Sequence, residues 1–192
     1  MVFAELQPWQ SAGQTVSVIL DGLPTQVRPA RCAGPPVSMH LLAGDSWAPA
    51  LCALLQAAQR RVEVAAYSVS TRWPKLASDK FNLYRHLLEA PARGLACSFI
   101  LAEHKRTAAT AKFNFWSARE LADHGWSVRR APRVRLLHAK LFIFDREVVS
   151  VGSHNIAHAA SSSNLDLSVC FAGRQAALPF AQWFDATWSR SK

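Results

Sequence analysis

The side chains best suited to phosphate chemistry lie in one short stretch of the last third of the sequence. His138 and Lys140 are separated by a single residue, and Gly152, Ser153 and Asn155 follow after a largely apolar segment. Alternate residues of a strand share a face, so a strand here would direct His138 and Lys140 to the same side, about 7 Å apart. An imidazole, an ammonium, a hydroxyl and an amide on one side could together hold a phosphate group.

A hairpin would bring the two ends of this stretch together. If its turn has two residues and follows Asp145, Asn155 lies opposite His138 and Ser153 lies opposite Lys140. All four side chains would then converge on one face of the hairpin. A longer turn would need a bulge to keep this register, so the pairing is a hypothesis.

The same residues form a recognisable pattern. The spacing H-x-K-x4-D-x6-G-S-x-N is matched without a gap and is similar to the signature of the phospholipase D superfamily. The stretch Ala-Ala-Tyr-Ser at 65–68 and the stretch Asn-Leu-Asp at 164–166 also resemble that family, and the similarity extends over about residues 38–190. The resemblance implies a phosphodiesterase, and the specified positions are His138, Lys140, Asp145, Gly152, Ser153 and Asn155.

The resemblance also implies a mechanism that uses side chains alone. A neutral imidazole is a competent nucleophile toward phosphorus, and His138 would attack the phosphodiester to form a phosphohistidine. A second, protonated histidine would protonate the leaving oxygen and then activate water. Lys140, Asn155 and Ser153 would stabilise the negative charge on the non-bridging oxygens. No metal ion or other cofactor is therefore expected.

The second histidine of this mechanism has no second motif to supply it. The chain has one His-x-Lys pair, and His154, at the variable position of the signature, should face away from His138 by strand alternation. A twofold homodimer would bring His138 of each chain to one shared site. A single motif resembles the family's bacterial endonucleases, whereas its lipases usually carry two motifs in one chain.

Two carboxylates are further candidates. Asp145 belongs to the signature, but it is better suited to holding the turn or pairing with a basic residue than to proton transfer. Asp166 stands where related nucleases typically carry Glu, and it could hydrogen-bond a catalytic imidazole and fix its tautomer. The candidate catalytic residues are therefore His138, Lys140, Asp145, Ser153, Asn155 and Asp166.

The charge balance favours a polyanionic substrate. The 192-residue chain has 22 Lys and Arg against 13 Asp and Glu, a formal net charge of +9, and such an excess attracts nucleic acid or anionic lipid headgroups. In the loop 70–80, Trp73 lies among cations, where it could stack on an unpaired base or pack beneath its own segment. A second cationic loop follows Leu101. The candidate substrate-binding residues are Arg72, Trp73, Lys75, Lys105, Arg106 and Lys112.

These observations favour a nuclease that hydrolyses DNA or RNA as a homodimer, with single strands preferred because so short a chain shows no long groove. A phospholipid hydrolase acting on phosphatidyl headgroups or cardiolipin is the alternative, since it would use the same catalytic residues. A nucleic-acid-binding module without turnover is a third possibility, which the intact His138 and Lys140 argue against. Phe113, Phe115 and Trp116 have spacings that suit partial burial in the core, with a base-stacking platform as the alternative.

Patterns typical of strands and helices alternate along most of the chain. Residues 1–37 are expected to be an N-terminal extension of unknown role with one strand-like stretch, Thr15–Asp21, and residues 38–192 to be the phosphodiesterase domain. Alternation followed by a hairpin predicts an α/β fold, a mixed β-sheet sandwiched by helices on both faces. The predicted strands are 39–43, 62–69, 95–101, 126–130, 136–144, 148–151 and 165–171, and the predicted helices are 45–60, 81–90, 111–124 and 175–190.

The remaining composition argues against several classes of protein. The four cysteines show no C-x-x-C spacing, so they are expected to be small buried hydrophobes rather than metal ligands or disulfides. The longest nearly apolar stretch, 47–58, is too short to span a bilayer, which needs about 20 residues. The N-terminus lacks the pattern of a secretory signal. We therefore expect a cytoplasmic protein without integral membrane association.

Overall fold

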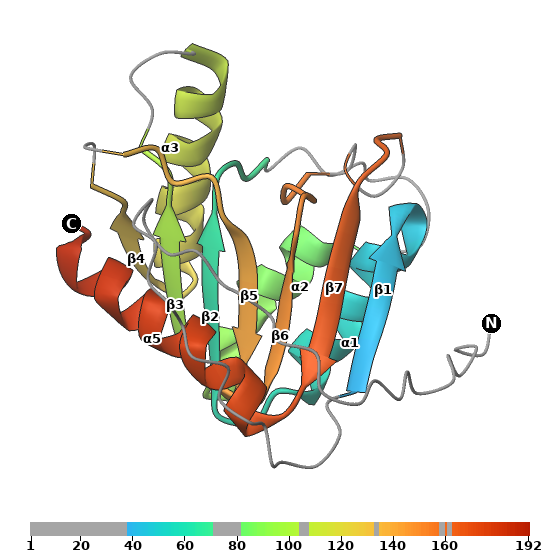
Figure 1. The fold of residues 1–192 in the computed structure, drawn as a ribbon. Coiled ribbons are helices and arrows are strands. Elements are labelled where there is room, and N and C mark those ends of the chain that lie inside the picture. Colours follow the sequence, from blue (N-terminus) through green and yellow to red (C-terminus); the bar gives the residue numbers. More distant parts are fainter. Residues whose placement is uncertain (1–37, 71–81, 104–107, 133–134, 158–159, 161–162) are drawn as a thin grey trace.

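A seven-stranded mixed sheet forms the centre of the protein in the computed structural model (Figure 1). The structure describes residues 38–70, 82–103, 108–132, 135–157, 160 and 163–192. The strand order is β1-β7-β6-β5-β2-β3-β4, in which β2, β3 and β4 are parallel and every other neighbouring pair is antiparallel. The strands are β1 (Ser38–Ala43), β2 (Arg61–Ala66), β3 (Ala96–Leu101), β4 (Ser127–Arg130), β5 (Lys140–Phe144), β6 (Val148–Gly152) and β7 (Leu167–Ala172).

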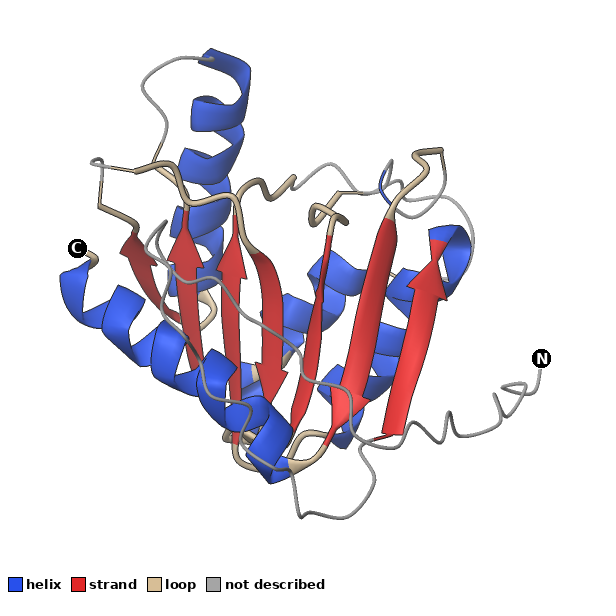
Figure 2. Cartoon of the chain, viewed as in Figure 1, coloured by secondary structure: helices blue, strands red, loops and turns tan. Residues whose placement is uncertain are grey.

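Helices cover both faces of the sheet, as the sequence predicts (Figure 2). Strand alternation explains the two cores, since Phe142 and Phe144 of β5 belong to one buried cluster and Leu141 and Ile143 to the other. The first cluster lies under α1, α2 and α3, and the second lies under α5. The helical elements are η1 (Gly44–Ser46), α1 (Trp47–Ala57), α2 (Leu83–Glu89), η3 (Pro91–Arg93), α3 (Ala108–Asp123) and α5 (Arg174–Arg190).

Each predicted strand and helix from residue 39 onward is present, and the largest difference concerns the start of β5. This strand begins at Lys140 rather than at residue 136, because its neighbour β2 ends at Ala66, the register partner of Lys140. One further backbone hydrogen bond, from Tyr67 N to Ala139 O at 3.0 Å, extends the pairing. His138 therefore lies just before the strand. The predicted strand Thr15–Asp21 lies outside the described residues.

The predicted register of the β5–β6 hairpin was wrong by one residue. Phe144 pairs with Val148, which leaves three residues between the strands instead of two. Asp145 and Arg146 have φ values of 54° and 58°, as in a tight hairpin turn, and Glu147 N donates to Phe144 O at 2.9 Å. Glu147 is the extra residue, and it shifts the partners of β5 by one position. Asn155 and Ser153 are therefore not the cross-strand partners of His138 and Lys140.

One edge of the sheet collects the ends of several strands. β2, β3 and β6 end at this edge, and β5 and β7, the two neighbours of β6, begin there (Figure 1). A side chain at Gly152, the last residue of β6, would collide with the hydroxyl of Ser168 and the carbonyl oxygen of Leu167. The glycine of the signature thus lets β7 approach β6 closely. This approach brings the residues before β7 next to those after β6.

Candidate active site

His138 and Lys140 form the centre of the site at this edge. The Lys140 Nζ is 3.3 Å from Nδ1 and 3.2 Å from Nε2 of His138, and it donates a hydrogen bond to the carbonyl oxygen of His138 at 3.0 Å. The Tyr67 ring lies edge-on against His138 with centroids 4.5 Å apart, and Lys140 Nζ is 4.8 Å from the Tyr67 centroid. Lys140 is 7% exposed, whereas His138 is an exposed residue. A reactive ring thus lies at the surface beside a largely buried cation.

Ser153 and Asp166 form a second, tightly bonded pair. The Ser153 hydroxyl donates to Oδ1 of Asp166 at 2.6 Å and accepts from Leu167 N at 3.0 Å, while Ser153 N donates to Leu167 O at 2.9 Å. The amide of Asn164 donates to Oδ2 of Asp166 at 3.2 Å. Ser153 therefore joins the end of β6 to the start of β7 and orients the Asp166 carboxylate. Asp166 itself lies just before β7 rather than within the predicted strand 165–171.

The charges of Lys140 and Asp166 interact. Burial lowers the pKa of Lys140, and the negative charge of Asp166 opposes this effect. Burial raises the pKa of Asp166, but the hydrogen bonds from Ser153 and Asn164 and the charges of His154 and Lys140 are together stronger, and they hold this pKa below its usual value. Asp166 is thus a carboxylate at neutral pH, and it favours the charged form of Lys140.

Asn155 lies in the segment that continues from Ser153. The next residue, Ile156, pairs with the segment after β2, since Ile156 N donates to Ser68 O at 3.2 Å and Ser70 N donates to Ile156 O at 2.8 Å. Oδ1 of Asn155 is buried and has no hydrogen-bond partner among the described residues. An unpartnered buried polar group costs about 1–3 kcal/mol, so Asn155 is better explained as a residue that faces a ligand than as one that stabilises the fold.

Asp145 lies far from this cluster. It follows the last residue of β5, whereas Lys140 is the first, so the two lie about 17 Å apart at the rise of a strand. The Asp145 carboxylate accepts backbone hydrogen bonds from Gln59, Arg60 and Arg61 at 2.9, 2.8 and 2.9 Å. Burial raises its pKa, but these bonds outweigh burial and hold the pKa below its usual value. The structure gives this signature residue a turn-holding position and does not bring it to His138.

The candidate substrate-binding residues fall mostly outside the described part of the chain. This applies to Arg72, Trp73 and Lys75, and also to Lys105 and Arg106. Lys112 is described, and it is exposed near the start of α3, the helix that rises beyond the strand ends in Figure 1.

His154 is buried in the core beneath α1. Its ring is fully buried and stacks on Trp47 with 4.7 Å between centroids, and Nδ1 is 2.8 Å from the Ser168 hydroxyl. Burial lowers the pKa of His154. The three described cysteines are also buried and free, and burial raises the pKa of Cys52 and of Cys97 to about 12. The cysteines are structural, whereas Nε2 of His154, like Oδ1 of Asn155, is buried and has no hydrogen-bond partner among the described residues.

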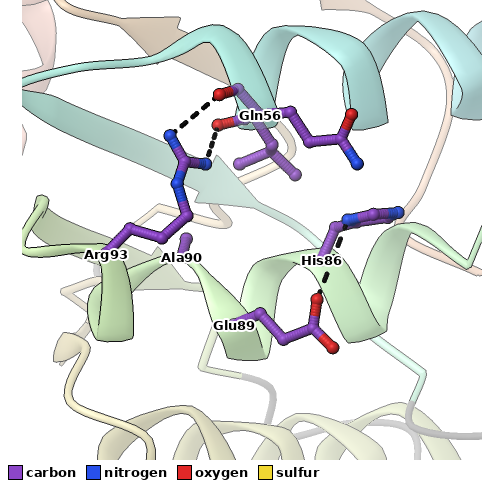
Figure 3. A pocket seen from close by; sticks show the side chains of 6 residues that line it. Gln56, His86, Glu89, Ala90 and Arg93 are labelled. Carbon is purple, nitrogen blue, oxygen red and sulfur yellow. Dashed lines mark hydrogen bonds and ion pairs between the residues drawn. The ribbon is translucent and has the colours of Figure 1, made fainter.

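A separate pocket lies at the opposite edge of the sheet, between α1 and the α2–η3 segment (Figure 3). Arg93 donates to the carbonyl oxygens of Leu55, Gln56 and Ala58 at 2.6, 2.9 and 2.6 Å, which satisfies the last carbonyls of α1. On α2, which faces α1, the Nδ1 of His86 lies 4.0 Å from the carboxylate of Glu89, three residues later in the same helix. The polar groups of this pocket are thus used to hold α1 and α2, and none of them belongs to the candidate site.

Within the described residues, no three His, Cys, Asp or Glu side chains gather closely enough to bind a metal ion. No helix in the described part of the chain has both the length and the apolar composition needed to cross a bilayer.

Two residues that support the site were not singled out from the sequence. Tyr67 contacts both His138 and Lys140. Asn114 of α3 is 5% exposed; its Oδ1 accepts from Val69 N at 3.0 Å, and its Nδ2 donates to Tyr67 O at 2.9 Å and Ala102 O at 3.1 Å. A polar residue on the buried side of a predicted helix was the one signal that could have identified Asn114.

Comparison with protein families gives one match over most of the chain. Residues 51–188 match a family described as cardiolipin synthase, PLD-like domain. No curated protein matches the chain in sequence.

Several solved structures share the fold. Nuc from Salmonella typhimurium, a phospholipase D family member, superposes with a TM-score of 0.69 at 19% identity, over 81% of this chain and 97% of its own. NucT from Helicobacter pylori gives 0.63 at 15% identity, over 81% and 98%. TrmBL2, an archaeal chromatin protein whose structure shows a mode of DNA binding, gives 0.53 at 17% identity, over 80% and 53%. At these identities the likeness shows the fold.

Proposed function

Because the chain belongs to the PLD-like domain family, we propose that it is a phosphodiesterase that hydrolyses DNA or RNA through a phosphohistidine, at a site shared by two copies of the chain. The observation that carries this proposal is the contact between the exposed imidazole of His138 and the largely buried ammonium of Lys140. Asn155, with its unpartnered buried amide oxygen, supports the same interpretation.

The reaction has two displacements at phosphorus. A ring nitrogen of His138 bonds to phosphorus, the ester P–O bond breaks, and the leaving oxygen keeps the electron pair and takes a proton from a second imidazole. That imidazole then removes a proton from water, whose oxygen bonds to phosphorus as the P–N bond breaks. Lys140 and the amide of Asn155 stabilise the charge on the non-bridging oxygens. Ser153 acts mainly by orienting Asp166 and joining β6 to β7.

A second copy of the chain supplies the second imidazole. His154, which directly follows Ser153, is fully buried against Trp47, whereas His138 is exposed, so His154 is not positioned to serve. A surface for a second copy is available near the site, where Met39 and Leu41 of β1 and Leu167 of β7 are more than half exposed. On that face α5 runs toward β4 and leaves β1 without a described helix over it (Figure 1). Exposed apolar patches of this kind favour association.

Nucleic acid is the favoured substrate because of the net charge of +9. A phospholipid is the second candidate, favoured by the description of the matching family, which refers to cardiolipin synthase. The two substrates share the phosphodiester, so the catalytic residues do not separate them.

The test is to incubate the protein with labelled DNA, labelled RNA and cardiolipin vesicles in the presence of a chelator. Wild type is expected to cleave a nucleic acid, and His138→Ala to lose this activity without a change in fold or mass. His124→Ala is the matched control, because His124 lies just after α3, where its Nδ1 contacts Glu120 O at 2.8 Å, away from the site. Turnover by His138→Ala, or cleavage of lipid alone, would contradict the proposal.

A further inference from the structure

Two large aromatic side chains lie half exposed on α3. Phe115 is 48% exposed and Trp116 is 49% exposed, and their rings meet edge to face with centroids 5.4 Å apart. The spacing in sequence suggested that Phe115 and Trp116 are partly buried in the core. The side of α3 that packs into the core is instead the opposite one, where Leu121 is fully buried. Two large rings exposed side by side form an apolar patch, and aromatic side chains are enriched where proteins bind partners.

Cations surround this aromatic pair. Lys112 lies one turn before Phe115 and Trp116, and Arg119 lies one turn after them, so all four share one side of α3. Lys112 and Arg119 are both exposed. From the neighbouring strand β4, the guanidinium of Arg130 lies 5.6 Å from the Phe115 centroid. The aromatic pair and these three cations therefore combine ring surfaces with positive charge.

A small cavity adjoins the pair. Its volume is about 120 Å³, and it is lined by Asn114 and Phe115 of α3, by Arg130, and by the end of β3 with the following residues, which include one carboxylate, Glu103. Arg130, Leu101, Ala66 and Lys140 are successive register partners across β4, β3, β2 and β5. At about 4.8 Å between strands, Arg130 lies about 14 Å from Lys140 along this row. That span equals about four nucleotides at the rise of a stacked strand.

We propose that Phe115, Trp116 and Arg130 form a binding site for an unpaired base of single-stranded nucleic acid, with Lys112 and Arg119 contacting the flanking phosphates. The inference rests on the proposed function and deepens it by naming the substrate class. Aromatic side chains stack on any base, and cations follow the backbone, so such a site selects unpaired strands without reading sequence. Duplex DNA keeps its bases stacked inside and gains only the phosphate contacts.

The exposed apolar area favours a base over a membrane. An interfacial helix buries a continuous apolar side along its length, whereas the exposed aromatics of α3 are confined to one turn between Lys112 and Arg119. Two rings and an adjoining cavity of about 120 Å³ suit one or two planar bases.

Binding is measured by fluorescence anisotropy with a labelled single-stranded oligonucleotide and a duplex of the same sequence, in the full chain carrying His138→Ala so that cleavage does not interfere. Trp116→Ala is expected to raise the Kd for the single strand about 10-fold or more, with a smaller effect on the duplex. Trp116→Phe, which keeps a ring, should recover most of this loss. The matched control is Leu178→Ala, since Leu178 is 47% exposed on α5, on the other side of the sheet.

Kinetics then separate this inference from the proposed function. In the chain with His138 intact, Trp116→Ala should reduce kcat/KM for the single strand about 10-fold more than for bis(p-nitrophenyl) phosphate. If the protein cleaves no nucleic acid but its binding of the single strand depends on Trp116, the proposed function is wrong and the base-binding site is supported. An unchanged single-strand Kd in the Phe115→Ala/Trp116→Ala variant would overturn the base site. Two further results for the Phe115→Ala/Trp116→Ala variant would also overturn the base site. One is a mass in sedimentation lower than that of wild type, which would place the two rings in an interface between chains. The other is a loss of binding to anionic vesicles with unchanged binding to the single strand.

Discussion

The ring of Tyr67 lies edge-on against the imidazole of His138, with 4.5 Å between the two centroids. The same ring lies 4.8 Å from the ammonium of Lys140. Tyr67 therefore holds the proposed nucleophile and its neighbouring cation in one arrangement. We expect Tyr67→Leu to reduce kcat by about 3- to 30-fold, the equivalent of one cation–π contact. Tyr67→Phe, which keeps the ring, should lose clearly less, and equal losses in the two variants would contradict this role.

Asn114 positions the segment that carries Tyr67. Asn114→Ala would leave the N–H of Val69 and the carbonyl oxygens of Tyr67 and Ala102 without this partner, at a cost of about 1–3 kcal/mol for each buried group. We expect a lower melting temperature and, well below that temperature, a lower kcat with little change in KM. Leu121→Ala, a cavity variant in the same helix, controls for lost stability. If it lowers kcat equally, the role of Asn114 is only structural.

Asp166→Asn should move the alkaline limit of activity to lower pH. Burial lowers the pKa of Lys140, and the charge of Asp166 raises it. Without that charge, the Lys140 ammonium loses its proton at a lower pH, and the positive charge needed near the phosphate disappears earlier. The measurement is kcat from neutral to alkaline pH. Asp185→Asn is the control, because Asp185 pairs with Arg146 at 2.6 Å, away from the site. An unshifted alkaline limb would argue against the coupling.

Asp145→Asn should reduce stability rather than catalysis. The bonds from Arg61, Gln59 and Arg60 hold the folded-state pKa of Asp145 below its usual value despite burial. Its contribution is therefore present above the unfolded-state pKa of about 3.9 and is lost as pH falls through the folded-state pKa. We expect the variant to lose about 1–3 kcal/mol near neutral pH, or roughly 3–10 °C in Tm, and this difference to shrink in acid. A large fall in kcat far below Tm would mean that Asp145 has a catalytic role.

Mixed dimers test whether the site is shared. If one reaction needs His138 from both chains, a dimer with one His138→Ala chain is inactive at its shared site. When wild-type and His138→Ala chains are refolded together, the activity should fall as the square of the wild-type fraction. A linear fall would mean that each chain works alone. Sedimentation should give a mass near twice that of the 21.2 kDa chain.

The sequence alone determined the family resemblance, the order of strands and helices, and the identity of the main chemical groups. These properties depend on short-range patterns. The spacing from His138 to Asn155 is fixed by consecutive residues, and alternation in β5 is visible in its apolar side chains. Strand alternation also predicted that His154 faces away from His138, but that prediction rested on the two-residue turn; the structure shows only that His154 is buried beside Trp47.

The tertiary structure decided the features that depend on distant partners. The carboxylate of Asp145 binds a backbone group 86 residues away in sequence, and Asn114 reaches the segment after β2 from a helix 45 residues later. The β5–β6 register depended on one extra residue, Glu147, in the turn. A local pattern specifies which residues share a face, but the contacts between segments are set by how the whole sheet packs, and only the folded chain shows them.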